Sequence, residues 1–157
     1  MKYKFLIGQE AQIHSIDWVL LAAIVQVESA ENPKAMRYEE KYPYLVDPPK
    51  YAKLLNISEA TETALQRFSF GLCQIMGANL REMGFKKELT NALEPEINLC
   101  YGAMTLERLM TRYKGDMPTA VSAYNAGTPH VENGVFRNQT YVTNVLGHYA
   151  AIHAVGV

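Results

Sequence analysis

The pattern of hydrophobic and polar positions predicts a protein built mainly from helices around one buried helix. The segment Trp18–Ser29 is almost entirely apolar, with Asp17 in the first turn of the predicted helix and Ser15 as its expected N-cap. Pro33 lies just beyond its expected end. A helix that is apolar on all sides is typical of a protein core. We therefore expect an all-α fold in which the other helices pack around this one.

Five further helices are predicted from capping residues and from apolar residues at helical spacing. The strongest pattern starts at Pro95 and ends at Gly115. Its apolar residues Leu99, Ala103 and Leu106 recur on one helical face. The predicted segments are 58–67, 71–83, 95–115, 116–127 and 138–149, with Ser58, Asp116 and Asn138 as expected N-caps and Gly84 as the terminator of the second.

The segment 34–57 has a different composition from the predicted helices. It contains Pro43, Pro48 and Pro49 together with several tyrosines. Because proline restricts the residue before it and cannot donate a backbone hydrogen bond, this composition favours an irregular segment or a short hairpin over a helix. We expect a surface lobe here.

Length, composition and charge fit one globular domain spanning residues 1–157. The chain is 48% apolar and 20% charged, which excludes a disordered protein, and its net charge of -1 supplies no basic field for binding nucleic acid. The longest apolar run, Trp18–Val27, is about half of the ~20 residues that a membrane-spanning helix needs. We expect no membrane insertion, and the apolar part of the N-terminus is too short for a secretory signal.

The cysteines and histidines do not indicate a metal site. Cys73 and Cys100 are too few for a disulfide-built fold and lack the spacing of zinc ligands, so buried free thiols are expected. The four histidines lack metal-binding spacing as well and are interpreted as surface or helix-end residues: His14, His130, His148 and His153. No metal or cofactor is expected.

Glu28 is the main candidate for chemistry. At 3.6 residues per turn it shares a helical face with Leu21, Ile24 and Val25, so the carboxylate is expected to face apolar side chains. Apolar surroundings raise the pKa of a carboxylic acid towards the range in which it can donate and recover a proton. Glu28 is thus a candidate general acid; the alternative is a buried glutamate paired with a structural Arg or Lys.

Four segments together resemble one protein family. Ala22–Pro33 resembles the Glu-Ser motif of soluble-lytic-transglycosylase-like domains, which belong to the lysozyme superfamily. Gly71–Met76 resembles the family's Gly-Leu-Met-Gln-Ile-Met signature, Ala123–Gly127 reproduces its Ala-Tyr-Asn-Ala-Gly motif, and Thr140–Leu146 is similar to its closing motif. The matches keep the family's order and cover about residues 15 to 150.

The resemblance implies a lysozyme-like fold and cleavage of peptidoglycan glycan strands. The family cuts the β-1,4 bond between N-acetylmuramic acid and N-acetylglucosamine and usually leaves a 1,6-anhydro sugar. By position, Glu28 would be the sole catalytic acid and base, and Tyr141 would orient it. The implied saccharide-binding residues are Ser69, Gln74, Met76, Tyr124, Asn125 and Tyr141. The alternatives are structural: core-edge aromatics, polar side chains that tie down helix ends, and a methionine that fills space.

The sequence also departs from the family pattern. Phe68-Ser69-Phe70 stands where the family often has Gly-Ala-x, and Cys73 replaces a methionine. Gln139-Thr140 adjoins Tyr141 directly, without the family's two intervening residues. The link 31–67 is longer than usual, and its tyrosines either stack on sugars or serve packing alone: Tyr38, Tyr42 and Tyr44.

Two other functions remain open from the sequence. A second carboxylate from the long link would make a hydrolytic muramidase similar to goose-type lysozymes, the candidates being Glu39, Glu40, Asp47, Glu59 and Glu62. A non-catalytic component that binds wall glycan is the alternative of another class. The expected place of action is the cell wall. A phage enzyme would reach it through cell lysis or virion entry. The other possibility is that the sequence is a trimmed domain of a bacterial enzyme.

Overall fold

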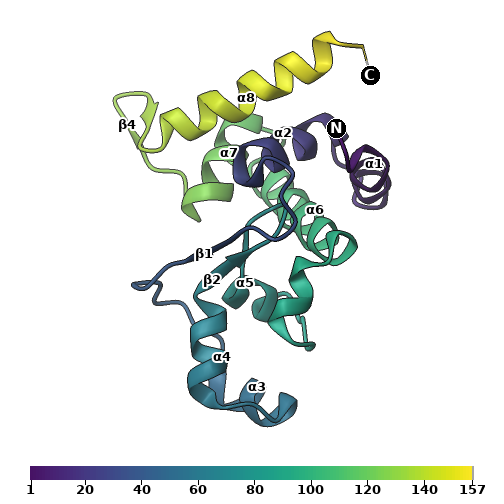
Figure 1. Ribbon diagram of the computed structural model, residues 1–157. Coiled ribbons are helices and arrows are strands. Elements are labelled where there is room, and N and C mark those ends of the chain that lie inside the picture. Colours follow the sequence, from purple (N-terminus) through teal and green to yellow (C-terminus); the bar gives the residue numbers. More distant parts are fainter. Residues whose placement is uncertain (157) are drawn as a thin grey trace. The chain divides into compact units, whose positions relative to one another are not determined.

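The computed structural model describes residues 1–156 and is mainly helical, so the predicted fold class is confirmed (Figure 1). The helices are α1 (Lys4–Ile13), α2 (Trp18–Ser29), α3 (Pro48–Leu55), α4 (Glu59–Gln66), α5 (Gly77–Glu82), α6 (Pro95–Arg112), α7 (Met117–Ala126) and α8 (Gln139–Ala154), with a 3₁₀ helix η1 (Leu89–Leu93). The strands are β1 (Met36–Tyr38), β2 (Phe68–Phe70), β3 (Ile75–Met76), β4 (Val131–Glu132) and β5 (Val135–Phe136). Among the described residues, every helix is too short or too polar to cross a membrane.

The described chain divides into two compact units. The first unit consists of Met1–Glu31 and the residues from Gly102 onward, and the second is Asn32–Tyr101. The boundary near residue 101 falls within α6, so this helix contributes residues to both units.

The first unit is organised around α2. Every residue from Val19 to Val25 is at most 6% exposed, and both α1 and α8 pack against this helix. The bounds of α2 match the predicted segment, but its N-cap is Asp17, whose side chain accepts a hydrogen bond from the Val19 N–H at 2.8 Å. The expectation that Ser15 is the cap is wrong, because Ser15 has a φ of 51° and belongs to the preceding turn.

The second unit contains a three-stranded antiparallel sheet in the order β1-β2-β3. In its register Met36 pairs with Phe70, and Tyr38 pairs with Phe68. Phe70 is fully buried, whereas Met36 and Tyr38 are 40% and 46% exposed. The strand in the predicted lobe therefore pairs with a segment about 30 residues later and does not form a local hairpin.

A helix occupies the second half of the predicted lobe, so the expectation of a segment without helix over 34–57 is wrong there. In α3, Pro48 and Pro49 lie in the first turn, where the backbone N–H that proline lacks has no intrahelical partner. Asp47 caps the helix by accepting a hydrogen bond from the Lys50 N–H at 3.3 Å. The prolines thus start this helix instead of breaking it.

The predicted helix over 71–83 is wrong before residue 77. Gly71 and Gln74 have φ values of 70° and 49°, which turn the chain between β2 and β3. The buried Asn98 holds this turn: its Oδ1 accepts the Cys73 N–H at 2.7 Å, and its Nδ2 donates to the Phe70 carbonyl at 2.7 Å. These contacts come from α6, more than 20 residues along the chain, so the local pattern does not contain them.

The other predicted helices are found close to their expected bounds. Ser58 and Asp116 cap α4 and α7 as predicted, through hydrogen bonds from the Thr61 and Thr119 N–H groups. The elements that were not predicted include α1, β2, η1 and the β4–β5 hairpin, in which Val131 pairs with Phe136. Neither cysteine forms a disulfide, as expected, but only Cys73 is fully buried, whereas Cys100 is half-buried.

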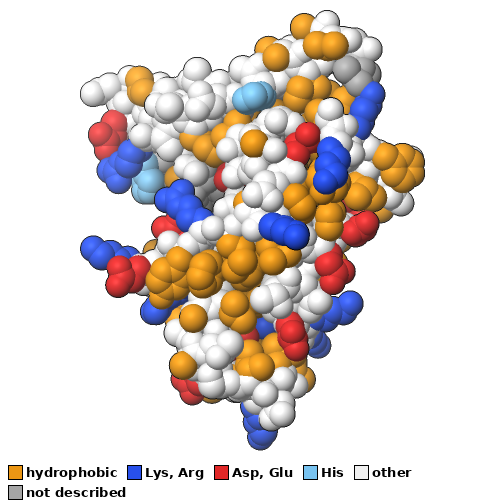
Figure 2. Space-filling model, in the orientation of Figure 1, with side chains coloured by type: hydrophobic (Ala, Val, Ile, Leu, Met, Phe, Trp, Pro, Cys, Tyr) orange, Lys and Arg blue, Asp and Glu red, His pale blue; other side chains and the backbone are white. Residues whose placement is uncertain are grey.

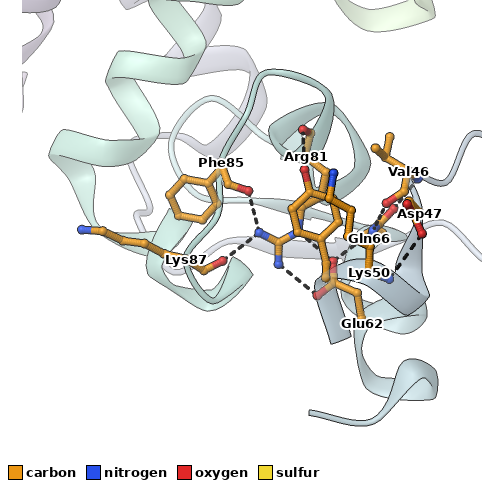
Figure 3. A network of polar contacts seen from close by, with 9 residues as sticks. Val46, Asp47, Lys50, Glu62, Gln66, Arg81, Phe85 and Lys87 are labelled. Atoms are coloured by element: carbon orange, nitrogen blue, oxygen red, sulfur yellow. Dashed lines mark hydrogen bonds and ion pairs between the residues drawn. The ribbon is translucent and has the colours of Figure 1, made fainter. Parts of the chain in front are cut away.

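A buried ion pair stabilises the second unit (Figure 3). Arg81 of α5 donates to both carboxylate oxygens of Glu62 of α4, at 2.7 and 2.9 Å, and both side chains are fully buried. The guanidinium also donates to the carbonyls of Phe85 and Lys87 at 2.7 and 2.8 Å. The ring of Tyr51 lies 4.4 Å from the guanidinium carbon. Each strong polar group of this pair therefore has partners inside the unit.

The same network reaches the long link before α3. Gln66 donates to Glu62 at 2.9 Å and to the Val46 carbonyl at 2.9 Å, and it accepts the Val46 N–H at 2.7 Å (Figure 3). The link is thereby fixed to α4 through a buried carboxamide.

Candidate active site

Glu28 lies in the last turn of α2, where the helix leaves the core of the first unit. Val25, one turn earlier, is fully buried, Glu28 is half-buried, and Ala30 is exposed. The Glu28 side chain thus lies at the edge of an apolar core and is still partly accessible to ligands. A general acid must be accessible in this way to reach its substrate.

Tyr141 contacts Glu28 directly. Its hydroxyl donates a hydrogen bond of 2.5 Å to Glu28 Oε1, across 113 residues of sequence. Tyr141 lies in the first turn of α8, which packs along α2 (Figure 1). A hydrogen bond this short fixes the direction of the carboxylate. The contact between the two side chains that the family resemblance implied is present, and their catalytic roles stay predictions.

A second tyrosine–carboxylate hydrogen bond joins α8 to the start of α2. Tyr149 of α8 donates to Oδ2 of Asp17, the N-cap of α2, at 2.8 Å. This hydrogen bond, with smaller contributions from burial and the charge of Asp17, raises the pKa of Tyr149 above its usual value. Since Tyr141 bonds at one end of α2 and Tyr149 at the other, α8 runs antiparallel to α2 and is held at two points.

The Ala-Tyr-Asn-Ala-Gly segment forms the end of α7. Tyr124 is half-buried and Asn125 is exposed. Oδ1 of Asn125 accepts a hydrogen bond from Nδ2 of Asn138 at 3.0 Å, and Asn138 also bonds Ser122. Ser122 was not predicted from the sequence, and the side chain of Asn138 does not cap α8 as expected. No local signal distinguishes this use of an asparagine from a cap.

The remaining predicted site residues form a cluster of their own in the second unit. Ser69 Oγ donates to Gln74 Oε1 at 2.8 Å, and Gln74 Nε2 donates to the carbonyls of Ala35 and Gly71 at 3.0 Å each. Met76 pairs with Ser69 in the β2–β3 register and is half-buried. Gln74 therefore ties its own turn to the segment before β1, and any contact of this cluster with a saccharide stays a prediction.

The tyrosines of the long link have different surroundings. The ring of Tyr38 lies 4.9 Å from that of Phe68, and Figure 2 shows hydrophobic side chains gathered over β1 and β2. Tyr42 donates to Asn79 at 3.0 Å, and burial raises its pKa. Tyr44 is 73% exposed. Tyr38 and Tyr44 are accordingly the more accessible of the three.

Three of the five candidate second carboxylates have structural partners. Glu62 is fully buried and bonded to Arg81, Asp47 caps α3, and Glu39 pairs with Arg37 at 2.8 Å. A carboxylate that is already neutralised in a core cannot bind and activate a water at a substrate. Glu62 is thereby excluded as a hydrolytic base.

The comparisons with known proteins agree with this fold and with the motifs. The family model of the transglycosylase SLT domain matches residues 5–145. A transglycosylase of Enterobacteria phage PRD1 is 28% identical over 140 residues, which are 89% of this chain and 40% of the phage protein. An inactive Glu-to-Gln variant of the lytic transglycosylase Slt from Pseudomonas aeruginosa has a similar structure, with a TM-score of 0.62 and 20% identity over 96% of this chain and 23% of that one. The chain thus spans less than half the length of either protein, and it belongs to the transglycosylase SLT domain family.

Proposed function

We propose that this protein is a lytic transglycosylase that cleaves the β-1,4 bond between N-acetylmuramic acid and N-acetylglucosamine in peptidoglycan. Membership of the SLT family supports the reaction class. The observation that carries the proposal for this chain is the half-buried Glu28 at the end of an apolar helix, hydrogen-bonded by Tyr141. The similar Pseudomonas structure is that of an inactive variant in which one glutamate is replaced by glutamine.

The proposed mechanism uses Glu28 first as acid and then as base. Protonated Glu28 donates its proton to the glycosidic oxygen, and the bond between that oxygen and the anomeric carbon breaks. The acetamido oxygen of the same muramic acid stabilises the positive charge that develops on the anomeric carbon. The glutamate, now ionised, removes the proton from the 6-hydroxyl, whose oxygen attacks the anomeric carbon and closes the 1,6-anhydro ring. The carboxylic acid is regenerated, so atoms and charges balance.

One carboxylate is enough for this reaction because the nucleophile belongs to the substrate. Most glycosidases use two, the second to attack or to activate water, although substrate-assisted exceptions are known. A well-oriented internal hydroxyl reaches effective molarities of about 10⁵ M or more, and can therefore compete with bulk water. The product depends on how well the enzyme holds the sugar ring.

We propose that the residues that match the family motifs contact the glycan. In the first unit these are Tyr124 and Asn125 at the end of α7, where Asn125 is exposed and oriented by Asn138. In the second unit they are Ser69, Gln74 and Met76 at the β2–β3 turn. The polar network around Gln74 supports a rigid turn there, which reduces the entropy lost on binding.

The product distinguishes this proposal from hydrolysis. Wall sacculi digested with the protein are expected to yield muropeptides ending in 1,6-anhydro-muramic acid, because the attacking group is the 6-hydroxyl. Mass spectrometry separates these from hydrolytic products, which are heavier by one water. Reducing ends in place of anhydro ends would select the muramidase. Failure to release any muropeptide from acidic to neutral pH would select the non-catalytic glycan-binding protein.

Tyr141 is proposed to be a positioning residue for Glu28. The variant Tyr141→Phe keeps the ring and loses the hydrogen bond of 2.5 Å, so the carboxylate can rotate away from its productive direction. We expect kcat to fall about tenfold or more, with KM little changed, in a muropeptide-release assay. The matched control is Tyr149→Phe, which removes the hydrogen bond from α8 to the other end of α2 and is expected to keep kcat. Equal losses in both variants would indicate a general weakening of α8.

The proposed place of action is the cell wall, because that is where the proposed substrate lies. The phage relative supports delivery through cell lysis or virion entry. The family model spans residues of both units, and we propose accordingly that residues 1–157 form one lysozyme-like domain.

A further inference from the structure

Asn138 stands at the N-cap position of α8, yet its side chain does not cap the helix. Its Nδ2 group donates to the Ser122 carbonyl and to Asn125 Oδ1, each at 3.0 Å, and its Oδ1 accepts the Ser122 hydroxyl proton at 2.7 Å. An asparagine at this position commonly stabilises a helix by capping it. The Asn138 side chain therefore bonds α7 instead of capping α8.

Ser122 makes one end of this network rigid. It is fully buried in α7, and both its hydroxyl and its carbonyl bond the Asn138 carboxamide. The Ser122 hydroxyl donates to the Asn138 carboxamide, and the Ser122 carbonyl accepts from it. Together these two hydrogen bonds determine which end of the carboxamide is oxygen and which is nitrogen. The hydrogen of Asn138 that points to Asn125 is consequently fixed in direction.

A fixed donor on Asn138 fixes the orientation of Asn125 in turn. Because Asn125 Oδ1 accepts this hydrogen, the NH₂ group of Asn125 occupies the other position of its carboxamide. Asn125 is exposed, so this NH₂ group can reach a ligand. The side chain is therefore presented as a hydrogen-bond donor, which suits an acceptor oxygen of a sugar hydroxyl or acetamido group.

We propose that Asn138 is a positioning residue that sets the donor polarity of Asn125 towards the glycan; this rests on the proposed function above. A carboxylate at position 138 can only accept hydrogen bonds at neutral pH. In Asn138→Asp, Asn125 turns its NH₂ group to residue 138 and presents its carbonyl oxygen outward. That oxygen repels the acceptor oxygen of the sugar, so substrate binding weakens.

The test compares Asn138→Asp with Asn138→Ala in steady-state cleavage of soluble glycan strands. We expect KM to rise about tenfold in the aspartate variant and less in the alanine variant, with kcat little changed. A purely structural role predicts a lowered thermal midpoint and a lowered kcat in both variants, because both leave the buried Ser122 carbonyl without its donor. Alanine being the more damaging change would overturn the proposal.

A double variant tests whether the effect passes through Asn125. In an Asn125→Ala background, the change Asn138→Asp is expected to add nothing to KM, since no carboxamide is left to reverse. Additive effects would show that Asn138 acts by another route, and the inference would fall. The wild-type protein separates this outcome from failure of the proposed function: if it releases no muropeptides, the reaction is wrong, whereas an active wild type with an equally active Asn138→Asp contradicts only the role of Asn138.

Discussion

Replacing Glu28 by glutamine is expected to abolish glycan cleavage while the protein folds normally. Glutamine has the shape of the glutamate and can still accept the Tyr141 hydrogen bond, but it cannot donate an acidic proton to the glycosidic oxygen. General acid–base catalysis contributes roughly 10²–10⁴-fold, and here one residue supplies both halves of it. We expect muropeptide release to fall by about 10³-fold or more, with the circular dichroism spectrum and thermal midpoint unchanged.

The matched control is Glu31→Gln, three residues further along. Glu31 accepts a hydrogen bond from the Lys2 backbone N–H at 2.9 Å, and glutamine keeps an oxygen for that bond. This variant is expected to retain most of the activity. If Glu28→Gln keeps more than a few per cent of wild-type release, another acid protonates the leaving oxygen and the proposed mechanism is wrong.

The helices that could be predicted from the sequence are those determined by local signals. Trp18–Ser29 is recognisable because a continuous apolar run requires a buried helix. Ser58 and Asp116 mark the starts of α4 and α7 because their side chains bond N–H groups three residues later. In each case the residues that determine the element lie within one or two turns of one another.

The elements that were predicted wrongly depend on distant partners. The turn at Gly71 is held by Asn98, and β1 exists because Met36 pairs with Phe70. Pro48 and Pro49 are compatible with a loop or with the first turn of a helix. The cap provided by Asp47 stabilises the helix. Propensity alone does not separate such alternatives.

In the candidate site, too, the contacts that could not be predicted from local signals join residues far apart in the sequence. The Glu28–Tyr141 contact joins residues 113 positions apart, and only the order of the family motifs indicated it before the structure. The orientation of Asn125 by Asn138 followed from neither motif nor periodicity, because an asparagine before a helix is ordinarily interpreted as a cap. Polar networks between elements are visible only when the elements are placed.

The Arg81–Glu62 ion pair is expected to be the most sensitive point of the second unit. The variant Arg81→Met leaves the fully buried Glu62 carboxylate without its cation and removes the donor of the Phe85 and Lys87 carbonyls. Removing one partner of a buried pair typically costs about 3–5 kcal/mol. We expect a loss of that size in the free energy of unfolding, measured by urea titration.

The exposed pair Arg37–Glu39 supplies the control, because Arg37→Met removes the same charge from a side chain that is 74% exposed. Solvent already screens that pair, so little change in stability is expected. In Glu62→Leu/Arg81→Leu both charges are gone, and stability should recover only in part, since the carbonyls of Phe85 and Lys87 still lack a donor. Full recovery would show that the guanidinium serves Glu62 alone, and a loss in Arg81→Met no larger than in Arg37→Met would show that water replaces the buried contacts.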